Sequence, residues 1–293
     1  MFQDYALVIV ATILLAVEFA FQKLYQKQCG TGIKAGLFFN AVSGLVTAVI
    51  FFMINGFRIQ ASFYAVILAA CMSVCLLSYT ILGFQVLKAG NMAFYTMFLM
   101  TGGMVIPYIF GLLFLNEPFS LLRMIGLLIM ICAIVLSNLS AARSSPKIIL
   151  LCVLIFFLNG GCSVSSKLCQ TPNPYGTATP TAFVFLTGAI RFVLCSAALL
   201  LYRKKNVQDQ TAPQRKIQKV LPIIACTAIV SGTSYMLQLM GAANLPATVL
   251  YPIVSGGSII FSTLAGMICF HEKPTLYQKL GVALCFLGTC LFL

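Results

Sequence analysis

Ten long apolar stretches follow one another along this chain, and only short polar stretches separate them. A helix needs about 20 residues to cross a bilayer, and each stretch is close to that length. The apolar signal is continuous rather than alternating, which excludes a transmembrane β-barrel. The sequence therefore predicts an all-α integral membrane protein with ten transmembrane helices. The stretches cover roughly 5–24, 34–55, 63–87, 91–115, 121–141, 147–169, 180–202, 219–241, 246–270 and 276–293.

The composition excludes several other classes of protein. Only 8% of the residues are charged, whereas a soluble domain carries about 25%. The formal net charge of +13 does not indicate nucleic-acid binding, because the basic residues lie mainly between the apolar stretches. Most of the 12 cysteines lie inside those stretches, where Cys acts as a small apolar residue. No CxxC pair occurs, so we expect no metal site, no cofactor and no disulfide framework.

The basic residues also predict how the chain crosses the membrane. Cytoplasmic loops are enriched in Lys and Arg, and the loops after odd-numbered stretches hold most of them. The first stretch is preceded by no basic residue, unlike a signal peptide, so we expect it to be retained. Both chain ends would then face outside. The odd loops contain Lys27, Lys34, Lys88, Arg143, Lys147, Arg203, Lys204, Lys205, Arg215, Lys216, Lys219, Lys273 and Lys279, and the even loops contain Arg58, Arg123 and Lys167.

The chain repeats itself with an offset that drifts from 144 to about 155 residues. FQKLYQ at 21–26 matches SSKLCQ at 165–170, and TGGMVI at 101–106 matches SGGSII at 255–260. Each half holds five apolar stretches, and an odd number turns the second half upside down in the membrane. We therefore predict two five-helix inverted repeats, 1–142 and 143–293. Inverted repeats are typical of secondary transporters, which bind substrate between the halves.

These residues resemble the drug/metabolite transporter superfamily, and specifically its ten-helix EamA-type members. Three features carry the resemblance: a Lys near the end of the first helix of each half, a glycine pair in the fourth helix, and a Glu–Pro or Glu–Lys–Pro junction before the fifth. The first half is also similar to the small multidrug resistance proteins. The resemblance implies a central cavity lined by helices one, three, four, six, eight and nine. The residues concerned are Lys23, Lys167, Gly102, Gly103, Gly256, Gly257, Glu117, Pro118, Glu272, Lys273 and Pro274.

Glu18 is the one carboxylate that lies deep inside an apolar stretch. It occupies a position where EamA-type proteins usually carry a neutral polar residue. An ionised carboxylate is costly in hydrocarbon, so an intramembrane one indicates function. Glu18 could exchange protons, or it could be a structural partner of Lys23, Arg191 or Gln22, which lies four residues further along the same helix.

Arg191 lies near the middle of the seventh stretch, where the resemblance also implies an arginine. It could bind an anionic group of a substrate or pair with Glu18. It could also be part of a buried structural ion pair, or its side chain could extend towards the membrane surface.

Three stretches of the second half carry polar residues at helical spacing, so that one face of each predicted helix is polar. Such faces turn away from lipid, towards a cavity or towards a neighbouring helix. Both interpretations stay open for single residues, and a cavity lining is favoured for the set. The three polar faces consist of Asn159, Ser163, Ser166 and Gln170; of Thr227, Ser231, Ser234 and Gln238; and of Tyr251, Ser255, Ser258 and Ser262.

Aromatic residues and helix breakers occur at matching places in the two halves. Aromatic walls suit planar or cationic ligands, although each Tyr could equally pack in the core. We expect the glycine pairs and prolines to interrupt the fourth and ninth helices and mark the site-forming, moving segments. The tyrosines are Tyr79, Tyr95, Tyr235 and Tyr251, and the prolines are Pro107 and Pro252.

The sequence thus predicts a secondary transporter of the cell membrane rather than an enzyme, because paired intramembrane Asp residues and HExxH are absent. The favoured mechanism is proton-coupled export of small amphipathic metabolites or drugs. The alternative is a facilitator or uptake carrier for a small polar metabolite, with Glu18 structural. The expected partners are the bilayer, a small-molecule substrate and protons, and one copy of the chain suffices to build the site. The predicted site comprises Glu18, Gln22, Tyr79, Tyr95, Asn159, Ser163, Ser166, Arg191, Tyr235, Gln238, Tyr251 and Ser255.

Overall fold

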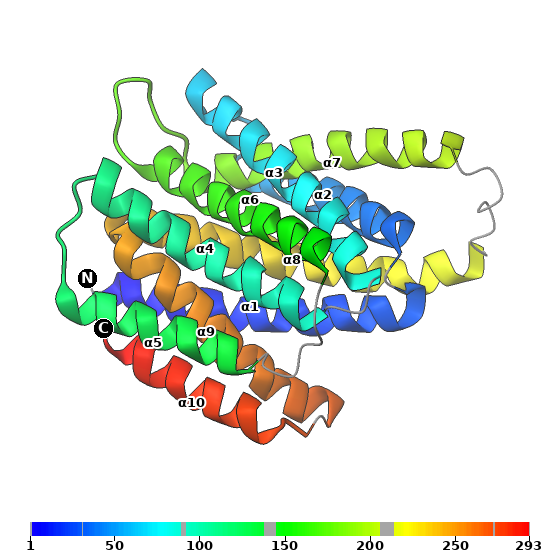
Figure 1. Cartoon of the computed structure of the whole chain (residues 1–293). Coiled ribbons are helices and arrows are strands. Elements are labelled where there is room, and N and C mark those ends of the chain that lie inside the picture. The colour runs from blue at the N-terminus through cyan, green and yellow to red at the C-terminus, as the bar shows by residue number, and fades with distance from the viewer. Residues whose placement is uncertain are drawn as a thin grey trace.

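The computed structural model describes residues 2–30, 32–88, 92–137, 145–205, 214–271 and 273–292, and these form ten helices (Figure 1). Each helix coincides with one of the ten predicted apolar stretches, so the prediction of an all-α, ten-helix chain is confirmed. Arg143, Glu272 and the predicted boundary between the halves lie outside the described residues. The helices are α1 Phe2–Cys29, α2 Ile33–Ile54, α3 Phe63–Lys88, α4 Met92–Phe114, α5 Leu121–Ser137, α6 Pro146–Gln170, α7 Pro180–Lys205, α8 Gln214–Asn244, α9 Ala247–Phe270 and α10 Leu276–Cys290.

Eight of these helices are long and apolar enough to cross a membrane. The other two, α5 and α10, are apolar but shorter, with 17 and 15 residues. Large apolar side chains are exposed on the outside of the bundle, for example Leu113 and Phe114 of α4 and Leu200 and Leu201 of α7. A soluble protein rarely exposes so much contiguous apolar surface. The chain is therefore a multi-pass membrane protein whose outer surface faces lipid.

The helices pack mainly against helices from the other half of the chain. α1 packs on α8 and α9, and α6 packs correspondingly on α3 and α4. α2 pairs with α7, and α5 pairs with α10 along one side of the bundle (Figure 1). Both chain ends lie at the same end of the bundle, at the left of Figure 1. The core is consequently formed between the halves rather than within either of them.

Glycines allow the paired helices to approach closely. A Cβ on Gly44 would lie 2.9 Å from the Gly188 carbonyl oxygen, and a Cβ on Gly188 would lie 3.1 Å from the Gly44 oxygen. The α5–α10 pair has the same character, because a Cβ on Gly126 would lie 3.0 Å from the Gly288 oxygen. Lipid provides no hydrophobic force between helices, so small residues that permit close van der Waals packing stabilise the association.

The expectation that glycine pairs and prolines interrupt two helices is wrong. α4 continues through Gly102, Gly103 and Pro107, and α9 continues through its own glycine pair and Pro252. A Cβ on Gly102 would clash with the backbone of Phe156 in α6, and a Cβ on Gly257 would lie 3.0 Å from the Thr12 hydroxyl in α1. These glycines therefore provide space for a neighbouring helix, and the helical hydrogen bonds around them persist.

We predict that Gly44→Ala destabilises the protein by about 1–3 kcal/mol, because the added methyl group overpacks the α2–α7 contact. A thermal melt in detergent would measure the effect. Gly32→Ala is the matched control, since a Cβ there meets nothing within 4 Å and its φ of −75° suits alanine. Equal melting temperatures for the two variants would contradict this account of the α2–α7 contact.

Candidate functional site

A cavity of about 830 Å³ lies at the centre of the bundle, between the two halves. Its walls come from all helices except α10, with α1 and α9 contributing most and α3 and α4 next. All twelve residues of the predicted site line this cavity: Glu18, Gln22, Tyr79, Tyr95, Asn159, Ser163, Ser166, Arg191, Tyr235, Gln238, Tyr251 and Ser255. Side chains chosen from the sequence for their charge, polarity and spacing therefore meet in three dimensions.

Among the described residues that line the cavity, the exposed ones lie at one end of the bundle. Ala242 of α8 and Leu250 of α9 line its inner end and are about 1% exposed. At the other end Gln26 and Gly30, at the end of α1, line the cavity and are exposed. The opening therefore lies away from the end that holds both chain termini. By the distribution of basic residues, this open end is the predicted cytoplasmic end.

Glu18 of α1 is held in the cavity wall by one direct contact. Its Oε1 accepts a hydrogen bond of 3.0 Å from Nε2 of Gln22, one helical turn further on. Arg191 of α7 acts on Glu18 as an opposite charge across the cavity, without a hydrogen bond between them. The hydroxyl of Tyr79 lies in the field of both charges. Among the described residues, Glu18 thus has one amide partner and a cation whose charge acts on it.

Arg191 is a half-buried cation in the cavity wall. Its Nε is inaccessible and has no hydrogen-bond acceptor among the described residues. A buried, unpaired donor is costly. The residue as a whole lines the cavity, where its charge faces an incoming solute. The Gly188–Gly44 contact lies one turn before Arg191 on α7, so the arginine projects from a tightly packed segment. The arrangement provides a fixed cation for a polar or anionic group.

The polar face of α6 lines the cavity and also joins helices. Asn159 Nδ2 donates to the Leu99 carbonyl of α4 at 2.7 Å, and Ser163 Oγ donates to the Gly103 carbonyl at 3.2 Å. Ser166 Oγ lies 2.7 Å from the Tyr235 hydroxyl of α8. Both interpretations of this face, cavity lining and helix packing, therefore hold for the same residues. Gln170 lies outside the cavity and donates to the Ala178 carbonyl at 3.4 Å.

The polar face of α8 was interpreted less well from the sequence. Only Gln238 of that set lines the cavity. Ser234 donates instead to the Ala11 carbonyl of α1 at 2.7 Å, and Thr227 donates within its own helix to Ile223 at 2.7 Å. The α8 set consists mainly of packing residues because α8 lies against α1 along that face. The whole α9 set, by contrast, lines the cavity.

Some lining residues gave no signal in the sequence. Met72 of α3 accepts a hydrogen bond of 3.1 Å from the Tyr235 hydroxyl through its Sδ, although it reads as an ordinary apolar residue. Phe270, at the end of α9, lines the open end of the cavity. The ammonium groups of Lys23 and Lys27 lie 4.8 and 4.5 Å from its ring centroid. These contacts depend on helices that are distant in sequence.

Contacts between loops and helix ends join the two halves at the closed end. Thr181 donates to Asn55 Oδ1 at 2.8 Å, and Ser62 donates to the Gly176 carbonyl at 3.0 Å. Ala61 and Ala178 form an isolated antiparallel β-bridge beside them. The two connections, α2–α3 and α6–α7, are therefore tied to each other across the bundle.

The EamA-like transporter family matches residues 146–293, which is half of the chain. The chain belongs to the EamA-like transporter family. This EamA-like transporter is also 33% identical, over 95 residues, to the probable 4-amino-4-deoxy-L-arabinose-phosphoundecaprenol flippase subunit ArnE of Enterobacter sp. (strain 638). The match covers 32% of this chain and 88% of that protein.

A solved crystal structure described only as that of a protein has the same fold. It superposes with a TM-score of 0.76 over 99% of this chain and 96% of that chain, at 11% sequence identity. The predicted membership of the drug/metabolite transporter superfamily is thus confirmed by the family match and the flippase relative. The chain is a multi-pass membrane transporter.

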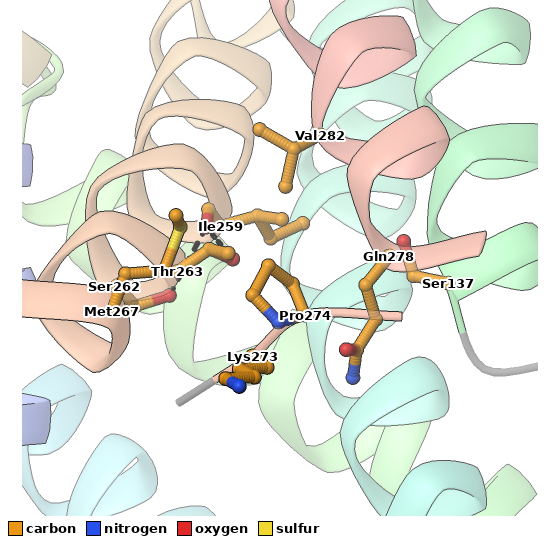
Figure 2. Close-up of a pocket in the computed structure, with 9 residues that line it drawn as sticks. All are labelled: Ser137, Ile259, Ser262, Thr263, Met267, Lys273, Pro274, Gln278 and Val282. Atoms are coloured by element: carbon orange, nitrogen blue, oxygen red, sulfur yellow. Dashed lines mark hydrogen bonds between the residues drawn. The ribbon is translucent and has the colours of Figure 1, made fainter. Parts of the chain in front are cut away.

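A second, smaller pocket of about 550 Å³ adjoins the central cavity of this EamA-like transporter (Figure 2). It lies where α5, α9 and α10 meet, and Ser137, Ile259 and Ser262 line both spaces. Lys273, Pro274 and Gln278 form its side towards α10 (Figure 2). The shared residues make this pocket a side extension of the central cavity.

We predict that Asn159→Ala lowers the free energy of unfolding by about 1–3 kcal/mol, because it leaves the Leu99 carbonyl without its donor from α6. Ser255→Ala should leave stability nearly unchanged, since no described residue accepts a hydrogen bond from its side chain. Melting curves of the two variants in the same detergent would compare Asn159, which hydrogen-bonds one helix to another, with Ser255, which only lines the cavity. A stable Asn159→Ala variant would mean that this side chain only lines the cavity.

Proposed function

We propose that this transporter exports small amphipathic metabolites or drugs across the cell membrane in exchange for protons. The observation that carries the proposal is the position of Glu18. Among the described residues that line the cavity, it is the one carboxylate, and the positive charge of the cavity-lining Arg191 acts on it. A cavity with one acid, an arginine and several tyrosines suits a molecule that has both charged and aromatic parts.

Two opposing effects act on Glu18. The low dielectric of the bundle favours the protonated acid, and the positive charge of Arg191 favours the carboxylate. A substrate that brings its own charge into the cavity changes this balance. An ammonium group would compete with a proton for Glu18, whereas an anionic group would neutralise Arg191 and favour protonation of Glu18. Either route links substrate binding to movement of a proton.

We further propose that residues 1–142 and 143–293 are inverted repeats that alternate access to the cavity. The helix contacts support this, because they keep their pattern when each helix is exchanged for the helix five places along. A Cβ on Gly126 would approach the Gly288 oxygen, and a Cβ on Gly281 would approach the Ala133 oxygen at 2.8 Å. These two contacts exchange with each other at the sequence offset of 155 residues. The structure is then the state that is open to the cytoplasm.

The flippase relative is consistent with an amphipathic substrate. Its name specifies an amino sugar joined through phosphate to a lipid. An amino group and a phosphate carry opposite charges, and Glu18 and Arg191 would complement them in that order. We propose the general class, a polar head with an apolar part, rather than this molecule.

A carrier without proton coupling is the second candidate, and a specific contact favours it. Gln22 already satisfies one oxygen of Glu18, and the nearby cation stabilises the carboxylate. A permanently ionised Glu18 would serve only to position Gln22 and Arg191. The polar faces of α6 and α9 would then form the binding site of a facilitator or an uptake carrier.

Replacing Glu18 with Gln distinguishes these two candidates. We predict that Glu18→Gln still exchanges substrate in proteoliposomes but no longer accumulates it under a pH gradient. The assay would screen labelled aromatic amines, aromatic acids and molecules that bear both groups. Asp4→Asn, which removes a carboxylate in the first turn of α1 that does not line the cavity, is the control and should accumulate normally. Unchanged accumulation and pH dependence in Glu18→Gln would favour the carrier without coupling.

Alternating access predicts that the closed end must open. The Cα atoms of an antiparallel bridge pair lie about 4.5–5.5 Å apart, within the range for a disulfide. We therefore predict that the double variant Ala61→Cys/Ala178→Cys loses transport when oxidised and regains it when reduced. Each single variant should remain active under both conditions. Full transport by the cross-linked protein would show that these two connections stay together during the cycle.

A further inference from the structure

Two charged side chains hold the turn between α8 and α9. Lys167 of α6 donates from Nζ to the Ala242 and Leu245 carbonyl oxygens, at 2.7 and 2.6 Å. Glu117, which follows α4, accepts from the backbone N–H groups of Ala247 and Thr248, at 2.6 and 2.8 Å. One turn is thus bound by four hydrogen bonds to charged groups from two other parts of the chain.

The charges of Lys167 and Glu117 are complementary to the partial charges at the end of α8 and the start of α9. The last carbonyls of α8 lack helical partners and carry partial negative charge, and the first N–H groups of α9 carry partial positive charge. Lys167 meets the negative end and Glu117 meets the positive end. Lys167 is only 7% exposed, and its charge and that of Glu117 attract each other. Hydrogen bonds to charged groups are about twice as strong as neutral ones.

The turn lies at the closed end of the central cavity. Ala242 and Leu250 flank the turn on α8 and α9, and both form the buried inner end of the cavity. Lys167 directly follows the cavity-lining Ser166 on α6. A solute that leaves by this end must pass between α8–α9 and the walls formed by α4 and α6, and Lys167 and Glu117 join those elements.

We propose that Lys167 and Glu117 are positioning residues of the transport cycle, which latch the α8–α9 turn while the cavity is open at the opposite end. The latch releases when the cavity opens at the end that holds the chain termini. This inference rests on the proposed alternating access and adds to it the contacts that set the balance between the two states. Neither residue touches the substrate in this arrangement.

The competing explanation is a fixed cap, in which Lys167 and Glu117 only stabilise the ends of α8 and α9 at the turn. In that case Lys167 and Glu117 would move together with the turn, and their loss would lower stability without changing the balance between states. A latch, by contrast, stabilises only the state with the closed end. Its loss must therefore increase the fraction of time during which the cavity is accessible from the side of the chain termini.

The native Cys162 provides a reporter for this accessibility. It lines the cavity, its thiol is free, and it precedes Lys167 by five residues on α6. A membrane-impermeant maleimide would be added to vesicles on the side that the termini face, and mass spectrometry would quantify labelling of Cys162. We expect Lys167→Gln and Glu117→Gln to raise the labelling rate about tenfold or more, the effect of losing charged hydrogen bonds.

Lys147→Gln is the matched control, because Lys147 is an exposed lysine on the same helix. It should label at the wild-type rate, and Lys167→Arg, which retains donors, should label near that rate. If Lys167→Gln does not fold, Glu117→Gln, which keeps an oxygen to accept one N–H group, decides the question. Wild-type labelling rates in a folded Lys167→Gln or Glu117→Gln variant with a lowered melting temperature would overturn the latch and establish the fixed cap.

The wild-type protein tests alternating access separately. Cys162 of the wild type should label from both sides. Oxidation of the double variant Ala61→Cys/Ala178→Cys should abolish labelling from the side of the termini. If the wild type shows this behaviour while the latch variants label at the wild-type rate, the proposed function stands and the latch is excluded. If Cys162 of the wild type is labelled only from the open side, however long the reaction runs, both alternating access and the latch are overturned.

Discussion

Hydrocarbon accepts no hydrogen bonds, and this property of the bilayer determines the rest of the structure. Every backbone polar group must be satisfied within a helix, so the described residues form helices joined by short turns. Polar side chains are excluded from the lipid face for the same reason. Asn159, Ser163 and Tyr235 consequently point inward, where they hydrogen-bond to neighbouring helices or face the cavity. The polar interior and the apolar exterior thus have the same physical cause.

Much of the architecture could be predicted from the sequence because these rules are local. Length and apolarity were sufficient to place ten helices, and a period of 3.6 residues placed the polar faces of α6 and α9 on the cavity. The corresponding set on α8 followed the same pattern but packs on α1 instead, as Ser234 does with Ala11. Periodicity predicts that a face turns away from lipid, and only the neighbouring helix decides between packing and a cavity.

The contacts that could not be predicted join residues far apart in sequence. Lys167 reaches carbonyls 75 and 78 positions away, and Glu117 reaches N–H groups 130 and 131 positions away. The sequence marked both residues as features shared with a family, without a role. The helices continue through both glycine pairs for a related reason. Glycine breaks an isolated helix, but Gly102 and Gly257 sit where a second helix leaves no space for a Cβ, and packing outweighs flexibility.

The exchange of helix contacts between the two halves also bears on how the protein is made. The first five helices enter the membrane before the helices on which they pack have been synthesised. α1 packs on α8 and α9, α2 packs on α7, and α5 packs on α10, which is the last helix of the chain to be synthesised. Until then, Glu18 of α1 and Gly44 of α2 lack the helices that cover them in the complete fold. The core can therefore form only after the second half has been synthesised.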